Sequence, residues 1–265
     1  MGILCSGSMV ESIYMKFNQQ YFDSMFKEYN TIDGNKWGIN WRASQIKRIE
    51  IALEMISNIL RKKDISILEI GCATADVTER VLDLNPYIKR YDALDISENA
   101  IKICKRKKFK NVTFYCGSIL DQEVGSGIYD LILCMDLIYY LSKDGQRQCM
   151  EKCYRALKPG GKVLISCPYD KLEIYKLLNM KEKYRIKSIE FNRNHLWACI
   201  ESKLMKYYVQ STPKEVKRMI HVLLSNTTLM NVAYQISCVL KIEKYTHFYI
   251  LYGKEYEETF FDNNN

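Results

Sequence analysis

The chain has 265 residues, of which 48% are hydrophobic, and 39 lysines and arginines against 31 acids give it a net charge of +8. This length fits one α/β domain with additions and is short for two full enzymatic domains. No apolar run reaches the length of a membrane span and no secretory signal opens the chain, so we expect a cytoplasmic protein without a transmembrane segment.

Ten cysteines raise the question of a metal site or a disulfide framework. Their spacing contains no Cys-x-x-Cys pair and no histidine at ligand spacing, so we expect no metal. Several of them fall in apolar segments, where a free thiol behaves as a small hydrophobic group, which indicates a reducing compartment.

The first part of the chain is aromatic. Tyr21, Trp37 and Trp41 belong to a segment that ends at Arg42 and precedes the first core element. Aromatic residues at helical spacing usually pack in a core, yet a lid over a binding pocket fits this position equally well. Both interpretations remain open. A helix over 44–61 follows, with one apolar face.

The most informative stretch runs from residue 65 to residue 95. A strand over 65–70 meets a tight turn at Gly71, and a helix follows whose apolar face is Val77, Val81 and Leu84. A second strand, over 91–94, delivers Asp95, where a carboxylate can accept both hydroxyls of a ribose. This pattern predicts a nucleotide-cofactor site, which a dinucleotide dehydrogenase would also show.

The remaining elements alternate along the chain. We predict helices over 97–108, 143–157 and 170–180, strands over 111–116, 129–135, 162–167 and 184–191, a long apolar-faced helical stretch from Thr212 and a last strand over 246–252. Basic residues over 102–110 fit either an anion-binding patch or the end of the helix over 97–108, and the helix dipole favours the second interpretation. Such alternation is typical of a doubly wound sheet, which binds ligands at the carboxyl ends of its strands.

Four segments resemble the class I S-adenosylmethionine-dependent methyltransferases. They are Leu68–Cys72, Leu94–Ser97, Tyr129–Leu141 and Leu157–Ile165, the last with the run Lys-Pro-Gly-Gly-Lys. The last two have no counterpart in a nicotinamide enzyme. The resemblance implies an α/β, Rossmann-like sheet of seven strands with the last strand antiparallel, and S-adenosyl-L-methionine as the cofactor.

The first motif departs from the family, which usually has Gly-x-Gly-x-Gly. Here Ala73 and Ala75 stand at the second and third glycine positions. Because alanine favours negative φ, we expect a less strained loop.

The resemblance also divides the chain. Residues 1–43 form a lid segment, 44–191 the core, 192–243 a helical insertion that caps the acceptor, and 244–265 the final strand and tail. In the family, Glu69 supports the methionine amino group, Ile96 packs on the adenine, and Asp121 faces the adenine amino group. The cofactor-binding positions implied are Glu69, Gly71, Cys72, Ala73, Asp95, Ile96, Ser118, Ile119 and Asp136.

The resemblance places the chemistry after the strand over 129–135. Asp136 stands where the nodulation protein S branch, which methylates amino sugars, carries an acid, and it can orient an ammonium group or accept a proton. Tyr139 and Tyr140 match the family's Tyr-Tyr-Leu. As residues of the substrate site or lid we name Tyr21, Trp37, Trp41, Arg42 and His195.

The sequence is compatible with three functions. A methyltransferase acting on nitrogen or oxygen of a small molecule leads. An RNA or protein methyltransferase is motivated by the positive charge, although no recognisable RNA-binding module is present, so nucleic acid stays open but not favoured. A cofactor-binding module without catalysis is motivated by the two missing glycines. The sequence does not indicate the oligomeric state.

Overall fold

The computed structural model describes residues 18–27, 38–171, 183–209, 213–241 and 244–254. Its centre is a seven-stranded sheet in the order β3-β2-β1-β4-β5-β7-β6. The strands are β1 (Ser66–Ile70), β2 (Arg90–Asp95), β3 (Val112–Cys116), β4 (Tyr129–Met135), β5 (Leu157–Pro168), β6 (Tyr184–Asn192) and β7 (His247–Lys254).

Strands β1 to β5 pair in parallel, and β7 pairs antiparallel to β5 and to β6. This confirms the doubly wound sheet with an antiparallel last strand. The chain runs from β1 outward to β2 and β3, then returns to place β4 beside β1. The strand order therefore reverses between β1 and β4, where open α/β sheets bind their ligands.

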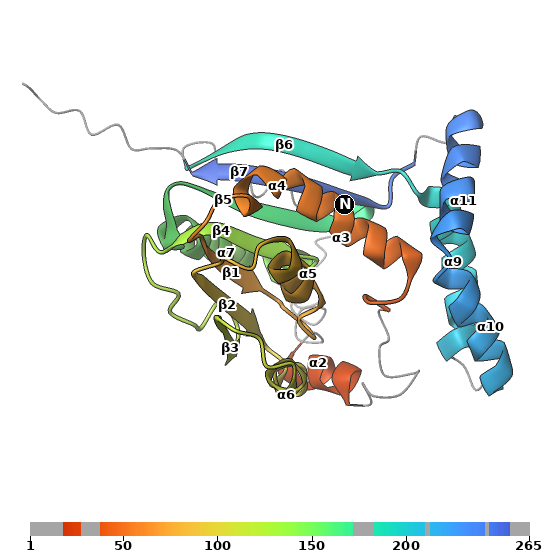
Figure 1. The fold of residues 1–265 in the computed structure, drawn as a ribbon, viewed down its shortest axis with the longest axis horizontal. Coiled ribbons are helices and arrows are strands. Elements are labelled where there is room, and N and C mark those ends of the chain that lie inside the picture. Colours follow the sequence, from red (N-terminus) through yellow and green to blue (C-terminus); the bar gives the residue numbers. More distant parts are fainter. Residues whose placement is uncertain (1–17, 28–37, 172–182, 210–212, 242–243, 255–265) are drawn as a thin grey trace, which may run out of the picture.

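Helices cover both faces of the sheet (Figure 1). Alternate residues of β4 point to opposite faces: Leu131 and Leu133 pack with the helices α3 to α6, and Ile132 and Cys134 pack with α7. The central strands β1 and β4 are buried on both faces, which explains their nearly continuous apolar sequence, whereas the edge strands β3 and β6 are largely exposed. The helices are α3 (Ala43–Met55), α4 (Ser57–Leu60), α5 (Asp76–Leu84), α6 (Glu98–Arg106) and α7 (Lys143–Ala156), with the short turns η1 (Ile138–Tyr140) and η2 (Tyr169–Lys171).

Two predicted elements differ from the structure. The helix over 44–61 is divided at Ile56, whose backbone leaves the helical region at φ −103° and ψ 4°, into α3 and α4. Leu84, assigned to the apolar face of α5, is 59% exposed, whereas Val81 of that face is buried and Val77 packs against the core. The helix over 170–180 lies, from residue 172 on, outside the described residues.

Strand β5 also begins earlier than predicted, at Leu157. The Lys-Pro-Gly-Gly-Lys run lies inside it, where the pairing with β4 shifts register between Tyr129 and Leu131. A Cβ at Gly161 would lie 2.9 Å from the carbonyl oxygen of Lys158 and 3.0 Å from that of Tyr129. The second glycine of the motif is therefore required by close backbone approach at this irregularity.

The loop between β1 and α5 contradicts the expectation of a relaxed backbone. Ala73 and Ala75 adopt φ of +46° and +63°, and Gly71 adopts +79°. The loop thus keeps the left-handed geometry that the family's glycines would take, and the two alanines bear the steric cost of their Cβ atoms. Buried Ala75 packs in the core beside α5, and the Ala73 carbonyl accepts from the Cys104 thiol at 3.1 Å.

The insertion between β6 and β7 contains three helices, α9 (His195–Val209), α10 (Lys214–Leu224) and α11 (Thr227–Val239), at one side of the sheet (Figure 1). Its small core consists of Trp197, Tyr208, Ile220, Leu224, Met230 and Ala233 with Ala43 of α3. The Trp41 ring stacks on His221 at 4.2 Å, and Arg42 forms an ion pair with the buried Glu201 of α9. The residues just before α3 therefore attach the insertion to the sheet.

Ala73→Gly is expected to raise the free energy of unfolding by up to about 1 kcal/mol, because glycine adopts a left-handed φ without a Cβ penalty and this gain exceeds its greater chain entropy. Urea denaturation measures the change. The control is Ala100→Gly in α6, where a buried helical alanine is replaced and about 1 kcal/mol is lost. Equal losses in both variants would contradict the strain at Ala73.

Candidate active site

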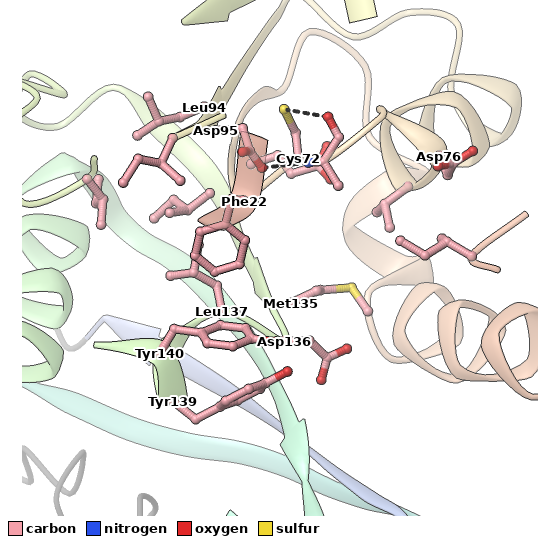
Figure 2. A pocket seen from close by; sticks show the side chains of 18 of the residues that line it. Phe22, Cys72, Asp76, Leu94, Asp95, Met135, Asp136, Leu137, Tyr139 and Tyr140 are labelled. Atoms are coloured by element: carbon pink, nitrogen blue, oxygen red, sulfur yellow. Dashed lines mark hydrogen bonds between the residues drawn. The ribbon is translucent and has the colours of Figure 1, made fainter. Parts of the chain in front are cut away.

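A pocket of about 210 Å³ opens where the strand order reverses, at the carboxyl ends of β1, β2 and β4. Figure 2 shows Asp95 toward one end, Tyr139 and Tyr140 with Asp136 toward the other, and Phe22 between them. Phe22 and Phe26 come from α2 (Gln19–Phe26), and Arg48 and Ile49 come from α3. The pocket is therefore built by the ends of the strands together with these two helices.

Gly71 fixes the turn that leaves β1. Its N–H and that of Cys72 both donate to the carbonyl oxygen of Leu94, at 2.7 and 3.0 Å. A Cβ on Gly71 would lie 2.5 Å from Cδ1 of Leu137, which follows β4. This glycine is thus needed twice, for its positive φ and for the contact with the segment after β4.

Asp95 ties three segments together at the end of β2. Its Oδ2 accepts from the N–H of Ala73 at 2.8 Å, and its Oδ1 accepts from the N–H of Ser97 at 2.9 Å. Burial raises the pKa of this carboxyl, and the two backbone hydrogen bonds oppose that rise. Each oxygen of a carboxylate can accept more than one hydrogen bond, so Asp95 could also receive ribose hydroxyls.

Asp23 was missed by the sequence analysis. Its Oδ1 accepts from the Ser97 hydroxyl at 2.6 Å and from the N–H of Asn99 at 3.2 Å, and its backbone oxygen accepts from Nδ2 of Asn99 at 3.0 Å. An acid beside the first turn of a helix is favoured by the unpaired N–H groups there. Asp23 therefore attaches α2 to α6, and no spacing in the sequence indicated this pairing.

The aromatic residues at the other end of the pocket also hold α2. The Phe22 ring packs edge-on against the Tyr140 ring with centroids 5.2 Å apart, and the ring centroids of Tyr140 and Tyr139 are 4.4 Å apart. Burial raises the pKa of both tyrosine hydroxyls, so both are neutral at ordinary pH. Two residues of the aromatic segment, Phe22 and Phe26, therefore line the pocket.

Asp136 follows β4 in a left-handed conformation, φ +51°, and its N–H donates to the carbonyl oxygen of Ser166 on β5 at 3.0 Å. Its Oδ2 forms an ion pair with Nη2 of Arg48 at 2.8 Å. Arg48 lies on α3, lines the pocket and was not singled out from the sequence. The proposed catalytic acid is thus charge-compensated, with both side chains mostly buried.

His247 of β7 completes this cluster. Its Nε2 lies 3.3 Å from Nη1 of Arg48 and 3.8 Å from Oδ1 of Asp136. Because an arginine only donates, Nε2 accepts and carries no proton. Burial lowers the pKa of His247 to about 4, which agrees with a neutral ring.

Glu69, at the end of β1, faces inward. Its Oε2 accepts from the hydroxyls of Thr78 and Tyr91, each at 2.6 Å. Burial raises the pKa of Glu69 to about 7, against the lowering effect of these two hydrogen bonds. Glu69 thus connects β1 to α5 through Thr78 and to β2 through Tyr91, and it also lines the pocket.

The remaining predicted residues divide into two groups. Cys72, Ala73, Ile96, Ser118 and Ile119 line the pocket as expected. Tyr21, Trp41, Arg42 and His195 do not line the pocket. The Tyr21 ring packs on the Phe22 ring with centroids 5.2 Å apart, and Trp41 and Arg42 contact the insertion. His195 begins α9, where it lies beside Cys199. Asp121 is exposed and also lies outside it, and Trp37 is outside the described residues.

Comparison with known proteins agrees with this geometry. Residues 67–161 match the family described as a methyltransferase domain. The chain is 26% identical to the phosphoethanolamine N-methyltransferase of Plasmodium falciparum over 69% of its own length and 68% of that protein. It is 29% identical to the tRNA N(3)-methylcytidine methyltransferase trm140 of Schizosaccharomyces pombe, over 64% of its own length and only 55% of that protein.

The fold is shared with solved structures. The N-methyltransferase NodS of Bradyrhizobium japonicum, in complex with S-adenosyl-L-homocysteine, superposes with a TM-score of 0.57 at 16% identity, covering 88% of this chain and 97% of that one. This likeness confirms the Rossmann-like methyltransferase fold. The Gly71–Asp95 end of the pocket has features that suit S-adenosyl-L-methionine, namely a tight glycine turn, a buried carboxylate that can accept hydrogen bonds and the apolar side chains of Ile96 and Ile119.

Asp95→Ala is expected to weaken the binding of S-adenosyl-L-methionine by about 2 to 3 kcal/mol, because it removes the acceptor for the ribose hydroxyls and frees the Ala73 N–H. Isothermal titration measures the affinity. Asp83→Ala, which truncates an exposed acid of α5, is the matched control and should bind normally. Affinity within twofold of wild type in Asp95→Ala would remove Asp95 from the cofactor site.

Glu69→Gln is expected to change how stability depends on pH. A folded-state pKa near 7, raised from 4.5, means that Glu69 favours the folded state fully below pH 4.5 and loses this contribution as the pH rises through 7. The loss amounts to about 3 kcal/mol. Thermal unfolding at pH 5 and pH 8 should therefore show that the stability of Glu69→Gln relative to wild type is greater at pH 8 than at pH 5. A pH-independent difference would contradict the raised pKa.

Proposed function

We propose that this chain is a class I S-adenosylmethionine-dependent methyltransferase that transfers the methyl group to a nitrogen or oxygen atom of a small molecule, such as an amino sugar. The observation that carries the proposal is the single pocket that joins the Asp95 end to the Asp136 end. Helix α2, attached through Asp23 and Phe22, covers it.

Methyl transfer from a sulfonium is an in-line displacement, in which the acceptor's lone pair forms a bond to the methyl carbon while the carbon–sulfur bond breaks. The protein's part is to align the acceptor and exclude water. The aromatic rings of Phe22 and Tyr140 and the buried Asp136 supply the two requirements, an apolar wall and a directional polar group.

Arg48 decides how Asp136 acts. The ion pair with Arg48 holds Oδ2 of Asp136 in place, so the carboxylate can accept a hydrogen bond from an acceptor N–H or O–H as an orienting group. Neutral Tyr139 and Tyr140 can donate hydrogen bonds beside it. The acceptor must lose a proton in the reaction, and the carboxylate of Asp136, which lines the pocket, is the group that we predict to accept it.

Support for a small acceptor comes from the pocket, which Phe22 and Phe26 of α2 line on one side, and from two relatives whose names indicate N-methylation, the phosphoethanolamine N-methyltransferase and NodS. The tRNA-modifying relative and the net charge of +8 favour the alternative, a nucleic-acid acceptor. A base would have to enter beneath α2, and the contacts of Phe22 and Asp23 oppose this.

An acceptor panel with methyl-labelled cofactor separates the two. Amino sugars and small phosphorylated amines are offered in parallel with bulk tRNA, and we expect label in the small-molecule fraction. Label confined to tRNA would replace the proposal by the alternative. Cofactor binding by titration without transfer to any acceptor, or failure to bind, would argue against catalysis.

Asp136→Asn is expected to lower kcat by about a hundredfold, because an amide neither attracts nor accepts the acceptor's proton. Affinity for the cofactor should stay within about threefold, since Asp136 lies at the other end of the pocket from Asp95. Steady-state kinetics and titration provide the two readouts. The control is Asp144→Asn, an acid that is 93% exposed. An unchanged kcat in Asp136→Asn would exclude Asp136 from the reaction.

A further inference from the structure

The insertion exposes much of the apolar surface of the molecule. Among the described residues, sixteen large hydrophobic side chains are exposed, and eleven of them lie between residues 200 and 240. A monomeric protein rarely leaves so much apolar surface together unless another surface covers it. The pocket does not use these side chains, because none of them lines it.

Helix α11 shows the pattern most clearly. Its buried positions, Met230, Ala233 and Ser237, form a narrow stripe against the rest of the insertion. Beside that stripe, at spacings of three and four residues, lies an exposed face that we call the α11 apolar face. Its members are Leu229, Val232, Ile236, Val239 and Leu240, with Val239 79% exposed. Four of them line one open hollow on the helix.

Charged residues are also distributed unevenly along this part of the chain. No aspartate, glutamate, lysine or arginine occurs from residue 219 to residue 240. Lys214, Lys217 and Arg218 precede this run, and Lys241 and Lys244 follow it. Residues 193–244 carry eight basic and three acidic residues, a net +5 of the chain's +8. One of the three acids, Glu201, is buried against Arg42 and does not reach the surface.

We propose that the α11 apolar face docks on an anionic lipid bilayer, with the flanking basic residues against the lipid head groups. Apolar side chains on a segment flanked in the sequence by basic residues fit such a surface, since burial of the side chains and attraction to acidic lipids act together. No described helix has the length and apolar character needed to cross a membrane. A second copy of the chain would bring another insertion of net +5 against the first, which charge opposes.

Sedimentation with vesicles tests this. The purified full chain is mixed with vesicles of phosphatidylcholine alone or with about one third phosphatidylglycerol. We expect binding only to the anionic vesicles, weakened by salt. The double substitution Ile236→Asn with Val239→Asn should reduce this binding roughly tenfold, and so should Lys214→Gln with Arg218→Gln. All four substituted side chains are exposed, Ile236 by 44% and Val239 by 79%, so the variants should fold. Circular dichroism checks that they do.

Leu84→Asn is the matched control, because Leu84 is an exposed apolar side chain on α5, away from the insertion. It should bind vesicles as wild type does. Absence of wild-type binding to anionic vesicles, or equal loss in Leu84→Asn, would overturn the proposal. A dimeric wild-type protein in solution that becomes monomeric in the double variant Ile236→Asn with Val239→Asn would also overturn the proposal. The α11 apolar face would then bind a second copy of the chain.

Discussion

The buried carboxylate of Asp95 holds together the segments on which the pocket depends. One oxygen binds the left-handed loop after β1 and the other binds the start of α6, where Asp23 attaches α2 through Ser97. Burying a carboxylate is unfavourable unless hydrogen bonds compensate it, and here the compensation comes from backbone groups that would otherwise be unpaired. The position of the loop, of α6 and of the covering helix therefore follows from one residue at the end of β2.

A second buried charge organises the opposite end of the pocket. Asp136 comes from β4, Arg48 from α3 and His247 from β7, so the cluster joins three elements that are far apart along the chain. Arg48 compensates the charge of Asp136, and the neutral His247 accepts from Arg48. The arrangement places a fixed, oriented carboxylate in an apolar pocket, where electrostatic interactions are stronger than in water.

The two ends of the aromatic segment before α3 have different roles. Phe22 and Phe26 of α2 cover the pocket, whereas Trp41 and Arg42, only some fifteen residues later, attach the insertion. Aromatic composition alone did not separate these roles, because an aromatic ring buries equally well against a ligand, a helix or a neighbouring ring. The difference lies in which element each ring meets.

The sequence by itself determined the sheet and the cofactor end of the site. Strand β4 has the predicted bounds, and Gly71, Asp95 and Ile96 lie together because strand ends, turns and helix starts are local features written in neighbouring residues. Only the tertiary structure decided that Ala73 and Ala75 adopt left-handed φ, since the bond from Ala73 to Asp95 and the packing of Ala75 override local preference. It likewise decided the pairings of Asp23 with α6 and of Arg48 with Asp136, which join residues dozens of positions apart and leave no periodic trace in the sequence.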